Sequence, residues 1–152
     1  MALTMGLLVY VLDRPMNSNY FLAQLQISLY NHDSHFGFIG YHLPTFIHTF
    51  SFCLITAGIL GCQKQCYSII AVCWFLFDIL FELLQKYDTT IVTLIPDWFE
   101  TIPVLENTKN YFINGTFDIF DVLSIAIGAI FAVLTLLAID KWVTYSQEVI
   151  KK

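Results

Sequence analysis

Charged side chains are scarce in this sequence, and basic ones are the scarcest. Asp, Glu, Lys and Arg make up 12% of the 152 residues, against about 25% in typical soluble domains. The chain contains seven Lys and Arg and twelve Asp and Glu, which gives a net charge of −5. That balance argues against nucleic-acid binding, because phosphate backbones bind clustered positive charge. Hydrophobic residues reach 57% of the chain, and the composition predicts an integral membrane protein.

Familiar motifs of catalysis and metal binding are also absent. The chain has no phosphate-binding loop, no HExxH and no nucleophile motif, so no local pattern marks an enzyme. Cys62 and Cys66 form a CxxxC without a second pair or a nearby His, and free thiols are expected in place of a zinc site. The apolar residues 2–12 follow no Lys or Arg and precede no cleavage site, so a secretory signal peptide is not expected.

Three apolar stretches approach the length of about 20 residues that a membrane-spanning helix needs. They are residues 43–60, 67–85 and 118–139. In the last stretch Ser124, Gly128 and Ala132 recur every four positions, which predicts close helix contact. Pro44 is expected in the first turn of the first stretch, where its missing N–H has no cost.

The remaining segments are less regular. Residues 2–12 either cross as a short fourth helix or lie at the interface, and residues 86–117 are interrupted by Pro96 and Pro103. The latter segment is expected to be half-inserted or to lie on the surface. The prediction is therefore an all-α fold, a single domain over residues 1–152 with its core in 43–140. It is an integral membrane helical bundle of about four transmembrane helices, with an interfacial segment between the last two.

The connector of residues 16–42 combines polar and aromatic residues. A short interfacial helix from Tyr20, capped by Asn17 or Ser18, is preferred over a strand, although alternating apolar residues fit a strand period. Its histidines and one acid are equally compatible with a metal site and with a solvated loop, and no metal is assigned to them. These residues are His32, Asp33, His35 and His42.

The few basic residues suggest an orientation. Lys64 lies in the short loop 61–66, and Lys141, Lys151 and Lys152 lie at the C-terminus. Placing both regions on the cytoplasmic side follows the bias of Lys and Arg toward cytoplasmic loops, and it puts residues 86–117 outside.

Depth along these helices brings five ionisable side chains into one layer near the outer face. A helix beginning at residue 43 places His48 about 7 Å below its end, at about 1.5 Å per residue. By the same rule Glu82 lies at about 5 Å, Asp78 at about 10 Å, and Asp118 and Asp121 within about 5 Å. Four carboxylates and one His cannot all stay ionised at low dielectric, so protonation, pairing or a bound cation must neutralise some of them.

Each of these residues has a structural alternative. Asp118 precedes an apolar run and is predicted to cap the helix that follows. Glu82 and Asp121 are the leading site residues, whereas Asp78 fits a buried contact between helices equally well. His48 is either part of the site or a core histidine with its own partner.

Three motifs in the chain resemble the motifs of a known protein family. They are FIHTFSF around His48, FELLQ with Glu82 and Gln85, and GTFDIFDVLSIAIGA with Asp118, Asp121 and Gly128. Their order and spacing resemble the VanZ-like family of small bacterial membrane proteins, over roughly residues 43–135. The resemblance implies a multi-pass protein of the bacterial inner membrane, similar to a factor for low-level teicoplanin resistance, and adds Gln85 to the ligand-binding candidates.

The favoured hypothesis is an envelope factor whose outer-face site, His48, Glu82 and Asp121, binds a lipid-linked or lipoglycopeptide-type ligand. A first alternative is an assembly subunit that pairs its intramembrane acids with a partner protein. A second is a membrane-embedded hydrolase, with Glu82 as base, His48 as acid and a metal held by Asp78 and Asp121. The sequence assigns no cofactor, and the lipid bilayer is the one partner that composition predicts.

Overall fold

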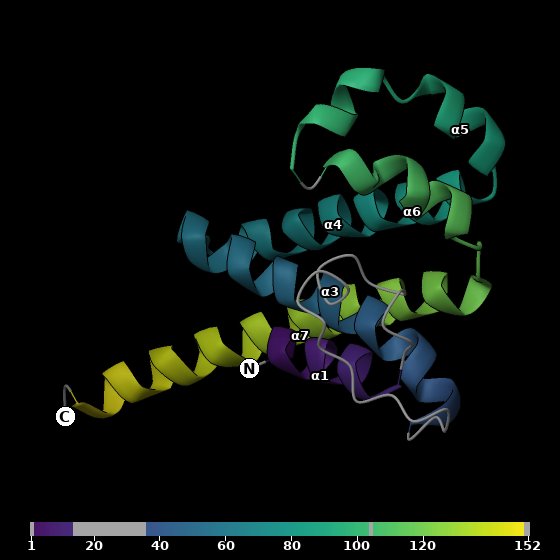
Figure 1. The fold of residues 1–152 in the computed structure, drawn as a ribbon. Coiled ribbons are helices and arrows are strands. Elements are labelled where there is room, and N and C mark those ends of the chain that lie inside the picture. Colours follow the sequence, from purple (N-terminus) through teal and green to yellow (C-terminus); the bar gives the residue numbers. More distant parts are fainter. Residues whose placement is uncertain (1, 14–35, 104, 151–152) are drawn as a thin grey trace.

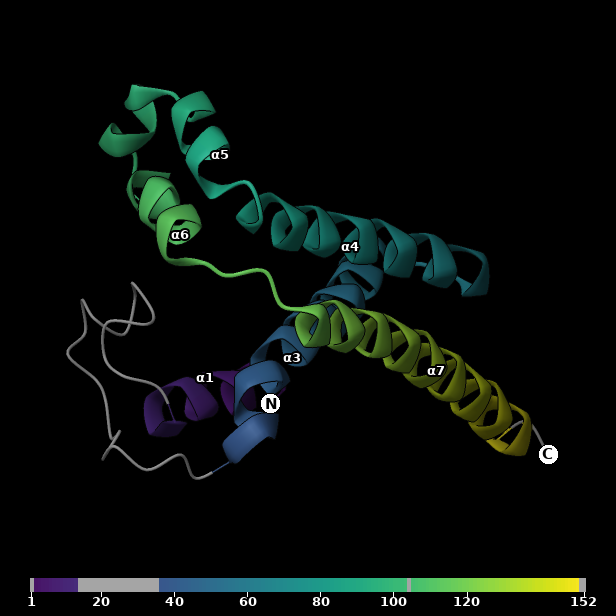
Figure 2. The same cartoon turned by 90° about the vertical axis from the view of Figure 1, so that its right-hand side faces the viewer.

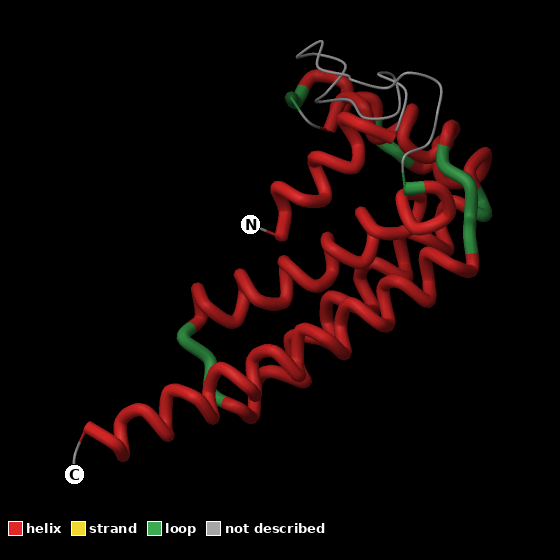
Figure 3. Tube along the Cα trace, turned by 90° about the horizontal axis from the view of Figure 1, so that it is seen from below, coloured by secondary structure: helices red, strands yellow, loops and turns green. Residues whose placement is uncertain are grey.

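The computed structural model describes residues 2–13, 36–103 and 105–150, and every regular element in these ranges is helical (Figure 3). The predicted connector helix and His32, Asp33 and His35 lie outside the described residues. In chain order the elements are α1 (Ala2–Asp13), α3 (Gly37–Leu60), α4 (Lys64–Gln85), α5 (Asp88–Leu94), η2 (Asp97–Thr101), η3 (Leu105–Asn107), α6 (Thr108–Asn114) and α7 (Ile119–Ile150).

Three of the described helices, α3, α4 and α7, are long and apolar enough to cross a membrane. Their 24, 22 and 32 residues correspond to about 36, 33 and 48 Å at 1.5 Å per residue. A hydrocarbon core of about 30 Å is therefore within reach of each. The predicted all-helical fold with membrane-spanning helices is confirmed.

The bundle is built around α3, which packs against both α7 and α4 (Figures 1 and 2). A tight turn joins α3 to α4, and Gly61 at φ 57° supplies the left-handed conformation that ends α3. The core between these helices consists mainly of small and medium side chains. It includes Cys53, Ala57, Ile70, Ala129 and Ala132.

The small residues of α7 do make the close contact that their spacing predicts. A Cβ atom on Gly128 would lie 2.7 Å from the carbonyl oxygen of Phe46 on α3. One turn further along, Ala132 is completely buried. Because side chains this small let two helix backbones approach, α3 and α7 pack here without bulky residues between them.

The start of α3 differs from the prediction. The helix begins at Gly37, six residues before residue 43, so Pro44 lies inside the helix and not in its first turn. Asp13, the last residue of α1, explains part of the earlier start. Both of its carboxylate oxygens accept from the backbone N–H of Phe36, at 3.2 and 3.3 Å. The first turn of α3 is thus stabilised by a side chain 23 residues earlier in the chain.

Helix α1 packs along the first half of α3 (Figures 1 and 2). Gly6 faces Ile47, where an added Cβ would lie 3.3 Å from Ile47 Cγ2, and Asp13 lies against Gly40. With 12 residues, α1 reaches about 18 Å. This is well short of a hydrocarbon core of about 30 Å.

At its other end α7 continues past the predicted residue 139 to Ile150, and this part projects away from the bundle (Figure 1). Where the projection begins, Lys64 Nζ lies 3.2 Å from Asp140 Oδ2. That ion pair joins the start of α4 to α7 and marks the end of the bundle opposite residues 86–117.

Residues 86–117, called the cap here, fold into short helices beyond the end of α4 (Figures 1 and 2). Phe112 of α6 is buried and lies against Phe81 of α4, their ring centroids 6.0 Å apart. Lys109 donates to Glu100 at 2.7 Å and to Asp97 at 2.9 Å. These two hydrogen bonds raise the pKa of Lys109, Glu100 contributing most, so the link stays charged around neutral pH.

Candidate functional site

The start of α3 and the start of α7 meet through a histidine and an aspartate. His42 Nδ1 lies 2.9 Å from Asp121 Oδ1, and the ring donates this hydrogen bond when the carboxylate is ionised. Thr45, one turn along α3, donates its hydroxyl to the same oxygen at 3.1 Å. Asp121 is therefore held by two side chains of one α3 face.

Glu82 joins α4 to the same place. It is 7% exposed, and its Oε1 accepts from the backbone N–H of Asp118 at 2.7 Å. Asp118 Oδ1 in turn accepts from the N–H of Phe120 at 2.9 Å, so the predicted capping role of Asp118 is confirmed. Glu82 also lies within electrostatic range of Asp118 and Asp121. We call His42, Glu82, Asp118 and Asp121 the polar cluster.

The cluster is rich in negative charge. It contains three carboxyl groups and one imidazole. Within the described ranges, no Lys or Arg forms an ion pair with any of them. Lys86 lies near this end, but its Nζ sits 5.7 Å from the ring centroid of Phe117.

A second polar pair lies deeper in the bundle. Thr49 Oγ1 is 2.5 Å from Asp78 Oδ2 and 3.3 Å from the carbonyl oxygen of Thr45. Since a hydroxyl has one proton, it donates to the nearer oxygen when Asp78 is ionised. His48 Nε2 lies 3.8 Å from Asp78 Oδ1, and the His48 side chain is half exposed whereas that of Asp78 is 10% exposed.

One face of α3 carries the residues that contact both Asp121 of the polar cluster and Asp78 of the deeper pair. His42, Thr45 and Thr49 follow each other at spacings of three and four residues, so they lie on one helix face. The first two contact Asp121 of α7, and the third contacts Asp78 of α4. Polar contacts between helices thus continue from the cap end into the middle of the bundle.

His48 does not share the described contacts of Glu82 and Asp121. With α3 beginning at Gly37, His48 lies eleven residues into the helix, about 16 Å at 1.5 Å per residue, and pairs with Asp78. His42 lies five residues into the helix, as far in as a start at residue 43 would place His48. The structure therefore brings together Glu82, Asp118 and Asp121 and supplies His42 as their histidine.

Gln85, the last residue of α4, faces the cap. Its Nε2 donates to the hydroxyl of Tyr111 at 2.8 Å. Gly115 lies directly beside it, since an added Cβ would come within 2.8 Å of Gln85 Oε1. The described contacts of Gln85 fix the cap against α4, one turn beyond Glu82.

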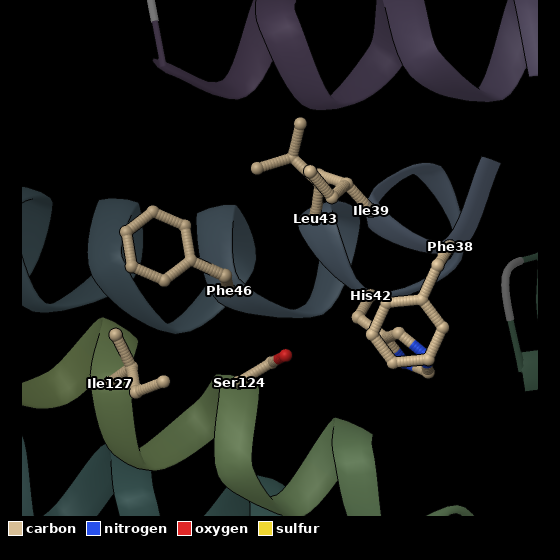
Figure 4. Close-up of a pocket in the computed structure, with 7 residues that line it drawn as sticks. All are labelled: Phe38, Ile39, His42, Leu43, Phe46, Ser124 and Ile127. Atoms are coloured by element: carbon tan, nitrogen blue, oxygen red, sulfur yellow. The ribbon is translucent and has the colours of Figure 1, made fainter. Parts of the chain in front are cut away.

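An apolar groove of about 220 Å³ adjoins the cluster between α3 and α7. Figure 4 shows its lining, with aromatic and aliphatic side chains around Ser124. The lining residues are Phe38, Ile39, His42, Leu43, Phe46, Ser124 and Ile127. His42 belongs to both the groove and the cluster, so an apolar surface and a negatively charged site meet at one side chain.

Sequence reasoning placed His42 in a loop and gave Thr45 and Thr49 no role. The available signal was their spacing, a polar stripe leading into an apolar helix. With a helix start predicted at residue 43, His42 lies outside the helix, and the helical spacing of His42, Thr45 and Thr49 is not apparent.

No family model matches the chain, and neither the curated proteins nor the solved structures contain a match to it. The sequence and structure thus define a class, a helical membrane protein with a polar cluster at one end of its bundle. The function of that cluster has to be argued from its geometry.

Proposed function

We propose that this protein is a VanZ-like bacterial envelope factor whose polar cluster and adjoining groove bind an amphipathic ligand, of the lipid-linked or lipoglycopeptide type. The observation that carries the proposal is the position of His42, shared between a negatively charged cluster and an apolar groove. A polar headgroup on the cluster would leave an acyl chain beside Phe38 and Phe46. Site residues of the proposal are His42, Glu82 and Asp121, with Asp118 and Gln85 as supports.

The cap favours the same kind of ligand. It carries exposed aromatic side chains at the end of the bundle that holds the cluster, among them Trp98 at 56% exposure, Tyr87 and Tyr111. Rings with one polar edge are typical of the membrane–water interface. An amphipathic ligand diffusing in the outer leaflet would meet these rings before it reached the cluster.

The proposal includes a topology. Lys64 at the start of α4 and Lys141, beside Asp140 of α7, lie at the end opposite the cap, which supports a cytoplasmic position for that end. The cap and the cluster then face the outer side of the bacterial inner membrane. We place α1 within the outer part of the membrane beside α3, because its exposed residues Met5, Leu7 and Leu8 are apolar and it packs against α3.

Teicoplanin susceptibility of a bacterial host tests the proposal. Expression of the wild type is expected to raise the inhibitory concentration, and Glu82→Gln and Asp121→Asn are expected to return it to the host level. Both variants keep the size of the side chain and remove its charge. Asp97→Asn, an exposed acid of the cap, is the matched control and should behave as wild type. Folded, membrane-inserted Glu82→Gln and Asp121→Asn that protect as well as wild type would refute the site.

One observation favours a second candidate, an assembly subunit. His48 and Asp78 lie well below the cap end of the bundle, and half of the His48 side chain is open to the surroundings of the helices. Asp78 is the partner of His48 within the chain, and the exposed part of the imidazole would contact a polar group of a second protein. This candidate predicts that the protein purifies from mild detergent with a second membrane protein, and that His48→Leu releases it. Monomeric wild type under the same conditions would argue against this candidate.

A further inference from the structure

The polar cluster has the ligand atoms of a cation site. His42, Asp118 and Asp121 each offer one nitrogen or oxygen atom, and these three atoms lie within 4.8 Å of one another. Two atoms bound to one cation at about 2.1 Å lie at most about 4.2 Å apart. Side-chain rotations that bring these atoms closer together would close the set around an ion.

The hydrogen bonds of the cluster leave capacity for such an ion. Contacts within the described ranges use His42 Nδ1, Asp121 Oδ1, Asp118 Oδ1 and Glu82 Oε1. The second nitrogen or oxygen of each side chain accepts no hydrogen bond from that part of the chain. Glu82, more than nine-tenths buried beside Asp118, adds a further carboxylate to the ones that can bind.

The number of carboxyl groups in the cluster also favours a bound cation. Three carboxyl groups, Glu82, Asp118 and Asp121, share this place with one imidazole, that of His42. Within the described ranges neither Lys nor Arg forms an ion pair with these carboxyl groups, so protonation, pairing with His42 or a bound cation has to neutralise them. A divalent cation bound to these groups would neutralise carboxylates that no cationic side chain of the described ranges pairs with.

We propose that the polar cluster binds one divalent transition-metal cation, with His42, Asp118 and Asp121 as ligands and Glu82 close enough to join them. One imidazole with carboxylates suits Mn²⁺ or Zn²⁺ better than the all-oxygen sites of Ca²⁺. This inference deepens the proposed function and rests on it for its purpose: a bound cation lets an anionic headgroup, such as a phosphate ester, approach three carboxylates that would otherwise repel it.

Mn²⁺ binding to the purified full chain in detergent tests the site without any lipid ligand. Mn²⁺ has little affinity for the four cysteine thiols, and the electron paramagnetic resonance signal of free Mn²⁺ falls as the ion binds. Wild type is expected to bind one equivalent. Asp118→Asn is expected to bind at least about tenfold more weakly. Because Asn caps helices as well as Asp does, this variant should keep the start of α7 intact.

Asp97→Asn is the matched control, since Asp97 is a fully exposed acid paired with Lys109. It should bind Mn²⁺ as wild type does. Absence of binding to the wild type, or equal affinity of all three proteins, would overturn the cation site. Either result leaves the teicoplanin test standing, because that test measures the roles of Glu82 and Asp121 without requiring a bound metal. Loss of protection by Glu82→Gln together with unaltered Mn²⁺ binding by Asp118→Asn would thus refute the metal and keep the envelope factor.

Discussion

Gly128→Ala is expected to destabilise the bundle by about 1–3 kcal/mol, the usual cost of forcing an extra group into a packed contact. The new methyl would lie 2.7 Å from the carbonyl oxygen of Phe46 and 3.4 Å from the backbone nitrogen of Phe50. Both are backbone atoms of α3, which no side-chain rotation can move aside. The two helices must separate, and the contacts of Ala132 and Cys53 in the adjoining core would loosen with them.

Gly58→Ala is the matched control for this substitution. Gly58 also lies within a membrane-spanning helix, but nothing lies within 4 Å of the Cβ that Ala would add. Ala is the better helix former by about 1 kcal/mol, so this variant should be as stable as wild type or more so. The free energy of unfolding, measured by circular dichroism in mixed detergent micelles, compares the two. Equal stability of the two variants would contradict the close contact of α3 with α7.

Glu82→Ala is expected to lower the free energy of unfolding by about 1–3 kcal/mol, because the backbone N–H of Asp118 loses its acceptor in a buried place. That N–H has Glu82 Oε1 at 2.7 Å as its described acceptor. The contact joins the last turn of α4 to the residue that caps α7. Its loss should also free the start of α7, which would appear as faster hydrogen exchange at residues 118–121.

Glu82→Gln separates this hydrogen bond from the charge. The amide keeps an oxygen where the carboxylate had one, so the N–H of Asp118 retains its acceptor. Both variants remove the negative charge near Asp118 and Asp121, and any gain from reduced repulsion is common to them. The difference in stability between Ala and Gln therefore reports the hydrogen bond and the side-chain packing. If Gln is as destabilising as Ala, Glu82 does not hold the start of α7 through its oxygen.

The features that sequence predicts well here are those that depend on neighbouring residues. Long apolar runs define the three membrane-spanning helices, since each run satisfies its backbone hydrogen bonds within itself. Asp118 caps α7 through an N–H two residues away. The spacing of Gly128 and Ala132 on α7 predicts a close helix contact, although not the identity of the helix that makes it.

Other features depend on residues far apart in the chain. The pairing of Thr49 with Asp78 needs α3 and α4 side by side, and that of His42 with Asp121 needs α3 beside α7. Depth along separate helices predicts which end of the bundle each acid occupies. It does not tell which side chains face each other, because the rotation of each helix about its axis is set by packing.

The sequence by itself determined that this is a helical membrane protein and that Glu82, Asp118 and Asp121 lie near one end of its bundle. Only the tertiary structure decided which histidine joins them. Residues 37–42 are less uniformly apolar than the run they precede, so hydrophobicity gives no sharp start to α3. Asp13 of α1 stabilises a start at Gly37 from 23 residues away. The helix α3 begins six residues earlier than predicted, and His42 lies at the depth predicted for His48.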